Sequence, residues 1–434
     1  MPDQTGITAH PLRGALLREA HARPFESLAI PLRVSHLVMQ TGTSGRSQEV
    51  AHVSELCREM GMEPPAEDAS HFIIETAHCR VRWERHTEFS TYTVFANGDE
   101  DAPFNNPAIH CLPKRWLERL PGELLAAMHL SLLNNGTLDA NTDSLGRYLQ
   151  PDSLAGSYCS GGAASVWTDF LADREGYLRF LVIDESLSPA QAGRLVQRLL
   201  ELETYRFMAL LGFPLARELA PDITEMENRL GTLMDRLATV SDLADERDLL
   251  TALSELSAQV ERLMARTNFR FSATAAYGTL VRRRLNALRE QRIEGVSTLD
   301  EFMERRLAPA LDTCVHMGER LERVSKRLSR AANLLRTRVD VALEAQNRDL
   351  LESMNRRARL QLRLQETVEG LSVVILSYYT VSLISFAFKG LGAAGRIPNP
   401  DVATALSIPV VVTVVTLGVR FVRRRVIRDD ADAG

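Results

Sequence analysis

The side chains able to perform acid–base or metal chemistry are concentrated in the first third of the chain. Nine of the ten histidines precede Leu130. Among them, His71 and His78 stand near Cys79, but this spacing matches no zinc-binding pattern, so we expect no metal there. The sequence contains no GxxxxGKS/T, HExxH or GxSxG motif and no GxGxxG that opens a helix. We therefore expect a protein that is not an enzyme and has no cofactor.

Two short segments carry groups that could bind a ligand, but neither contains a catalytic motif. The segment from His21 to Phe25 (HARPF) would present Arg23 to an anion and His21 as a proton switch. The alternative, which we favour, is a packed turn fixed by Pro24. The glycine-rich stretch 156–162 would cradle a phosphate with backbone N–H groups, but no lysine follows it. We expect a flexible loop there, before the next strand.

The composition excludes several classes of protein. The 434 residues are 45% apolar and 25% charged, with a net charge of -5. This balance is unlike that of a disordered chain, and it lacks the basic surface of a nucleic-acid-binding protein. Five scattered cysteines without a CxxC pair favour reduced thiols in a reducing compartment. The N-terminus shows no basic and apolar regions of a cleaved signal peptide.

Up to about Leu219 the hydrophobic patterns predict a mixed α/β region. Charges between Glu203 and Arg206 are expected to pair along one face of a helix. The predicted helix at 116–133 rests on apolar residues spaced three or four apart. The predicted elements are strands at 31–40, 71–74, 80–83 and 90–96, a hairpin of 164–171 and 177–183, and helices at 46–60, 116–133 and after Ser188.

After Pro221 the pattern changes to long amphipathic helices, with breaks expected at Pro221 and Gly295. Leucine, cysteine or alanine recurs every seven residues from Leu307 to Ala342, and apolar residues from Ala310 to Ala331 fill the intermediate positions. A seven-residue apolar repeat predicts helices packed as a coiled coil. An unbroken helix from Leu299 to Phe388 would be about 130 Å long, which is typical of a stalk.

Two uncharged apolar segments near the C-terminus predict a pair of transmembrane helices. Residues 371–388 and 403–419 carry no charge, and a segment of about 18 to 20 apolar residues is long enough to cross a bilayer. Arginines cluster before the first segment and after the second, which places both termini in the cytoplasm. Tyr378 and Tyr379 lie in mid-segment, so we expect their hydroxyl groups to face another protein helix and to serve in membrane-helix packing.

Two resemblances follow from these segments. HARPF, Glu203 to Arg206 (ETYR) and Glu369 to Tyr379 (EGLSVVILSYY) resemble an uncharacterised bacterial family described as predicted membrane-anchored. The arrangement of the chain also resembles the CorA-type magnesium channels, with Leu371-Ser372 similar to the Leu-Thr that opens their pore helix. The Gly-Met-Asn motif of that family is absent, and Phe388 to Leu391 stands in its place. A positively charged loop next to it predicts no conduction of divalent cations.

Together these features predict an α+β fold class with four parts. These are a cytoplasmic α/β domain (1–220), a coiled-coil stalk (221–366), two transmembrane helices (367–422) and a cytoplasmic tail (423–434). We expect a multi-pass protein of the bacterial inner membrane that forms a homo-oligomer and binds a ligand or partner in the cytoplasm, as a scaffold or sensor. The lipid bilayer is the other expected partner, and nucleic acid is not expected. The alternative is a divalent-cation transporter of CorA-like architecture.

Overall fold

The computed structural model describes residues 10–14, 17, 26–42, 45–98, 103–138, 142–393 and 399–431. The chain separates into two compact units. One comprises residues 1–239 and 251–332, and the other comprises residues 240–250 and 333–434. The first unit contains the β-sheet and is mixed α/β, as the sequence predicts, and the second consists of the ends of long helices.

The strands are β1 Leu32–Gln40, β2 His71–Glu75, β3 Cys79–Arg85, β4 Phe89–Asn97, β5 Glu123–Leu133, β6 Ala155–Cys159, β7 Ala164–Ala172, β8 Leu178–Asp184 and β9 Gln291–Arg292. The α-helices are α2 Arg46–Glu59, α3 Lys114–Leu117, α4 Thr142–Leu145, α5 Pro189–Leu210, α6 Gly212–Thr239, α7 Leu243–Leu288, α8 Leu299–Arg306, α9 Ala308–Ala393 and α10 Pro400–Ala431. Two short 3-10 helices are η1 Ala108–Cys111 and η2 Pro151–Ser153.

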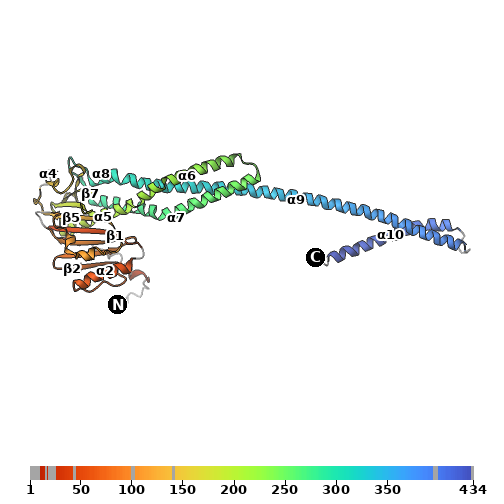
Figure 1. The fold of residues 1–434 in the computed structure, drawn as a ribbon, viewed down its shortest axis with the longest axis horizontal. Helices are drawn as coiled ribbons and strands as arrows, with labels where there is room; N and C mark the ends of the chain where they lie inside the picture. The colour runs from red at the N-terminus through yellow and green to blue at the C-terminus, as the bar shows by residue number, and fades with distance from the viewer. Residues whose placement is uncertain are drawn as a thin grey trace. The chain divides into compact units, whose positions relative to one another are not determined.

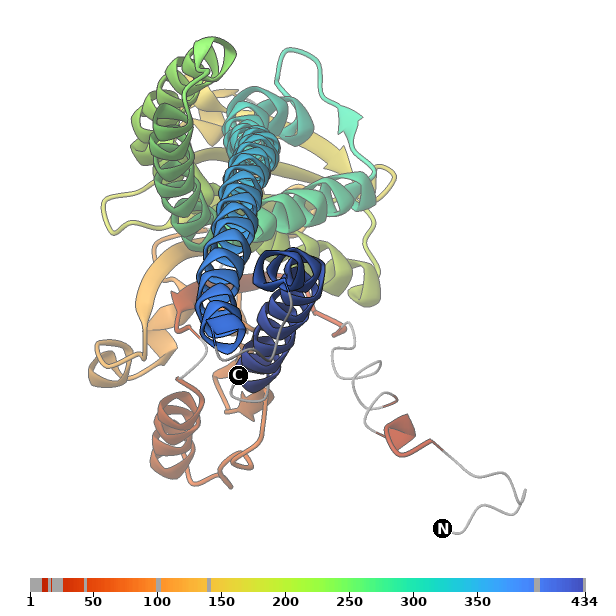
Figure 2. The same cartoon turned by 90° about the vertical axis from the view of Figure 1, so that its right-hand side faces the viewer.

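All nine of these strands form one sheet, in the order β2-β3-β4-β1-β5-β8-β7-β6-β9. Its pairings are antiparallel except for the parallel pair β5–β8. Helix α5 covers one face of the sheet, and its apolar residues Leu195 and Leu199 are fully buried against that face. Helix α2 packs on the opposite face through Val53 and Leu56. Figures 1 and 2 show this layered arrangement.

The start of α5 illustrates how local sequence fixes an element. Ser188 accepts a hydrogen bond from the Gln191 backbone N–H, and the Gln191 side chain accepts one from the Ser188 N–H. This reciprocal capping satisfies two N–H groups that a helix start leaves without partners. Pro189 occupies the first turn, where a missing N–H does no harm. The predicted start of this helix is therefore confirmed.

Three sequence-based predictions are wrong. The helix expected at 116–133 is replaced by α3 and by strand β5, which lies at the centre of the sheet between β1 and β8. From Ala126 onward β5 is buried on both faces, so apolar residues stand on both sides of the strand, and apolar and polar residues alternate only from Met128 to Leu132. Residues 156–159 belong to strand β6, and only the next three form a turn. Pro221 lies inside α6, which continues through it.

The long helices bury the seven-residue repeat from Leu307 to Leu335 and leave Ala342 partly exposed. In the first unit, Leu321 of α9 packs with Ile223 of α6 and Leu263 of α7. Figure 1 shows these three helices side by side in that unit. In the second unit, α10 folds back beside the end of α9 (Figures 1 and 2). Ser377 of α9 and Val411 of α10 are buried in this second unit.

Candidate functional site

A pair of arginines on β3 forms the centre of the candidate site. Arg80 and Arg82 are two residues apart, so their side chains project from the same face of the strand. Both guanidinium groups lie over the ring of Phe95 on the neighbouring strand β4, at 4.8 and 5.5 Å from its centroid. An aromatic face attracts a cation in this position. The ring therefore holds the two arginines side by side.

The two arginines share a carboxylate from the segment that precedes β1. Glu26 forms ion pairs with both Arg80 and Arg82, and the Arg82 Nη1–Glu26 Oε1 distance is 3.4 Å. A second carboxylate, Glu84, lies 3.3 Å from Arg82 Nε. The side chains in this group are between 11% and 26% exposed, so water screens these pairs only in part.

Backbone contacts fix the same segment on α5. The Leu28 N–H donates to the Pro189 carbonyl oxygen at 3.0 Å. The Glu26 carbonyl oxygen passes so close to Gly193 that a Cβ atom there would lie 1.7 Å from it. Glycine is required at this position because no other residue leaves space for the crossing chain.

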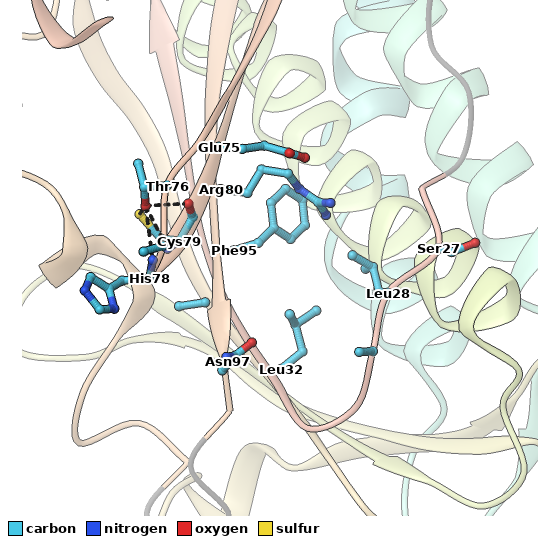
Figure 3. A pocket seen from close by; sticks show the side chains of 13 residues that line it. Ser27, Leu28, Leu32, Glu75, Thr76, His78, Cys79, Arg80, Phe95 and Asn97 are labelled. Carbon is cyan, nitrogen blue, oxygen red and sulfur yellow. Dashed lines mark hydrogen bonds between the residues drawn. The ribbon is translucent and has the colours of Figure 1, made fainter. Parts of the chain in front are cut away.

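A cavity of about 330 Å³ opens beside the arginines. Figure 3 shows Arg80 against the Phe95 ring on one wall, with Leu28 and Leu32 on the opposite wall. The turn between β2 and β3 closes one end, where the Thr76 hydroxyl donates to the Cys79 carbonyl oxygen at 2.7 Å. The cavity thus combines a cationic group, an aromatic ring and an apolar wall, which suits a small anion with an apolar part.

A buried polar group lies further along the same face of the sheet. His36 on β1 forms hydrogen bonds with the hydroxyl groups of Thr93 on β4 (2.8 Å) and Thr204 on α5 (3.1 Å). Burial lowers the pKa of His36 to about 3, with the positive charge of Arg82 acting in the same direction. His36 is therefore neutral near pH 7 and connects two strands to α5.

The opposite face carries a serine–histidine pair. The Ser35 hydroxyl and His129 Nδ1 are 2.9 Å apart, and the hydroxyl accepts a hydrogen bond from the Ile109 N–H. In such a pair, the imidazole could activate the serine hydroxyl as a nucleophile. However, Ser35 is 0% and His129 4% exposed, and the His129 ring is stacked on Tyr177. A substrate has no access to the hydroxyl group, so the pair holds β1 to β5.

The residues singled out in the sequence are not gathered into one site. His21 and Arg23 lie outside the described residues. Tyr378 and Tyr379 are 70% and 63% exposed on α9, and their ring centroids are 5.8 Å apart. In the part of the chain that the structure describes, no three histidine, cysteine or acidic side chains are grouped as metal ligands.

The segment from Glu203 to Arg206 has the pairing that the sequence predicts. Arg206 Nη2 lies 2.6 Å from Glu203 Oε2, three residues earlier on α5. Sequence reasoning missed the site at Arg80 and Arg82. Their spacing of two within a predicted strand was a visible signal, because it places both charges on one face. The participation of Phe95 and Glu26 could not be read from the sequence.

Comparison with known proteins identifies the family. Residues 8–426 match the profile of a family described as a protein of unknown function (DUF3422), so the chain belongs to this family. The predicted resemblance to an uncharacterised family is thereby confirmed. No curated protein and no solved structure matches the chain. The resemblance to CorA-type channels therefore has no support beyond the sequence.

Proposed function

We propose that this protein is a membrane-anchored, self-associating scaffold or sensor of the bacterial inner membrane. The end of α9 and helix α10 would cross the bilayer, and the sheet-containing unit would bind a ligand or partner in the cytoplasm. The observation that carries this proposal is the exposure of apolar side chains on two uncharged helical segments. These segments have mean hydropathies of 1.9 and 2.2, and only 6% of each is buried within the chain.

Exposure of these side chains to water would be unfavourable. Leu383 is 70%, Phe386 74% and Leu406 70% exposed. Burying one such side chain is worth about 1.5 to 3 kcal/mol, and a monomeric soluble protein rarely exposes many of them together. A hairpin in a soluble core would instead be covered by the rest of its own chain. The exposed surface therefore supports a lipid or protein environment for both segments.

Reporter fusions test the anchoring and its direction. Reporters placed after Arg363, after Asn399 and after Arg428 should read cytoplasmic, periplasmic and cytoplasmic, because arginine-rich flanks stay inside. The fused proteins should remain in the membrane pellet after an alkaline carbonate wash. A cytoplasmic reading at Asn399 together with release by carbonate would contradict the proposal.

The ligand part of the proposal rests on the cavity beside Arg80. The Glu26 carboxylate already bound there indicates the chemical group that the arginines accept, and Phe95 offers an apolar surface next to it. A ligand at 100 times its dissociation constant stabilises a protein by about 2.7 kcal/mol. Succinate and inorganic phosphate are suitable probes for a thermal-shift measurement.

The expected result is a rise in melting temperature that Arg80→Gln abolishes. Arg58→Gln is the matched control, because it removes the same charge from the exposed end of α2 and should keep the rise. An equal shift in all three proteins would indicate a general ionic effect, and no shift in any of them would exclude these anions as ligands.

A further inference from the structure

A second seven-residue repeat follows the first along α9, one residue out of step with it. Leucine or tyrosine occupies its positions from Leu343 to Tyr378 every seven residues, except that arginine stands at Arg357. The positions four residues after each of these, which include Met354 and Ile375, complete the same stripe on the helix. The members of this second seam are Leu343, Asn347, Leu350, Met354, Arg357, Gln361, Leu364, Val368, Leu371, Ile375 and Tyr378.

Unlike the first repeat, the second seam is uncovered in the single chain. Leu350 is 59%, Met354 58%, Leu364 65% and Leu371 60% exposed. By contrast, Leu328 in the first repeat is fully buried. Apolar residues at this spacing form a stripe, interrupted at Asn347, Arg357 and Gln361, that fits another helix with the same repeat. A lipid surface does not require a regular alternation of three and four residues.

The distribution of charge points to the same kind of partner. Nine charged residues lie between Asn347 and Leu371, and eight of them occupy the three outer positions of each heptad. Only Arg357 falls on the second seam. The positions that flank the seam, such as Leu351, Ala358 and Leu360, carry no charge. Charged side chains thus lie away from the stripe and its flanks, and charged residues are likewise depleted at the core of protein interfaces.

We propose that the second seam pairs with the second seam of another copy of this chain, in parallel and in register. The parallel direction rests on the proposed membrane anchoring, because two copies in one membrane share an orientation. In that register Asn347 and Gln361 would meet their own counterparts, and each amide can both donate and accept a hydrogen bond. Tyr378 would likewise meet a protein helix within the membrane.

Disulfide trapping in native membranes tests this register. Cysteines are introduced singly as Leu350→Cys and Leu364→Cys, and copper–phenanthroline with dissolved oxygen serves as the oxidant. Disulfides form only when the two Cα atoms approach within about 4.4 to 6.8 Å. The two positions are about 21 Å apart along the helix, so an antiparallel pair could not bring both to their counterparts. Both variants should therefore give covalent dimers of differently tagged copies.

Two controls make the outcome decisive. Arg356→Cys, at an exposed outer position, and the unchanged chain with its five native cysteines should give little dimer. Yields at Leu350 and Leu364 no higher than in these controls would overturn the proposal, as would a dimer at only one of them. A single chain per particle by light scattering in detergent would overturn it too. Carbonate extraction of the same samples reports separately whether the anchoring itself fails.

Discussion

Replacing Gly193 with alanine tests whether the segment before β1 is held on α5 as the structure shows. The added methyl group would lie 1.7 Å from the Glu26 carbonyl oxygen, and Cβ atoms almost never approach another heavy atom within 3.0 Å. The crossing segment must therefore move away from α5. The segment then loses the hydrogen bond from the Leu28 N–H to the Pro189 carbonyl oxygen. The ion pairs of Glu26 with Arg80 and Arg82 are weakened at the same time.

The expected magnitude follows from two opposing effects. Inserting a methyl group into a tightly packed place destabilises a protein by about 1 to 3 kcal/mol. Alanine in place of glycine inside a helix stabilises it by about 1 kcal/mol. Gly193→Ala should therefore lower the free energy of unfolding by up to about 2 kcal/mol. Gly231→Ala is the matched control: it lies inside α6 with no atom within 4 Å of its would-be Cβ, and should only stabilise.

Hydrogen–deuterium exchange by mass spectrometry locates the effect. Peptides that cover Glu26 to Leu32 should exchange roughly 5- to 160-fold faster in Gly193→Ala, which is the rate change for a local loss of about 1 to 3 kcal/mol. Peptides from strand β5 should exchange as in the unchanged chain. If Gly193→Ala and Gly231→Ala are equally stable and the first segment stays protected, the close packing of this segment on α5 is refuted.

Two further predictions concern the first repeat and pH. Leu321→Asp should destabilise the protein by several kcal/mol, because Leu321 is 2% exposed and an unpaired buried charge is costly. Glu322→Ala, in the exposed pair with Lys326, should change stability by well under about 1 kcal/mol, and equal melting temperatures for the two variants would contradict the burial. Burial lowers the pKa of His36 to about 3 and of His129 to about 4, so below pH 6.5 the unfolded chain binds more protons and stability falls as pH falls. From pH 6.5 to 5 each histidine should lower the free energy of unfolding by about 2 kcal/mol. Urea unfolding, followed by the fluorescence of the three tryptophans, which all lie in the sheet-containing unit, should show this loss. A free energy of unfolding that stays constant between pH 7 and 5 would rule it out.

Several features of this protein could be predicted because local sequence alone fixes them. The capping residues Ser188 and Gln191 set the start of α5 whatever packs around it. The strand at β4 and the hairpin of β7 and β8 follow from β-branched and aromatic runs separated by a tight turn. The two uncharged C-terminal segments are likewise a matter of composition, which requires no knowledge of neighbouring elements.

Other features depend on partners that are distant in sequence. The residues of β5 have helix-like spacing, and they form a strand because β1 and β8 bury both faces of it. Periodicity cannot separate a fully buried strand from a helix.

What the sequence determined by itself was the series of amphipathic and apolar segments, because hydrophobic period and charge are properties of neighbouring residues. What only the tertiary structure decided was which of those residues meet. Glu26 and Arg80 are far apart in the chain, and they are joined because the segment before β1 crosses α5 at Gly193. The same holds for the two repeats of α9. Their spacing is alike, but α6 and α7 cover Leu321, whereas Leu350 remains exposed.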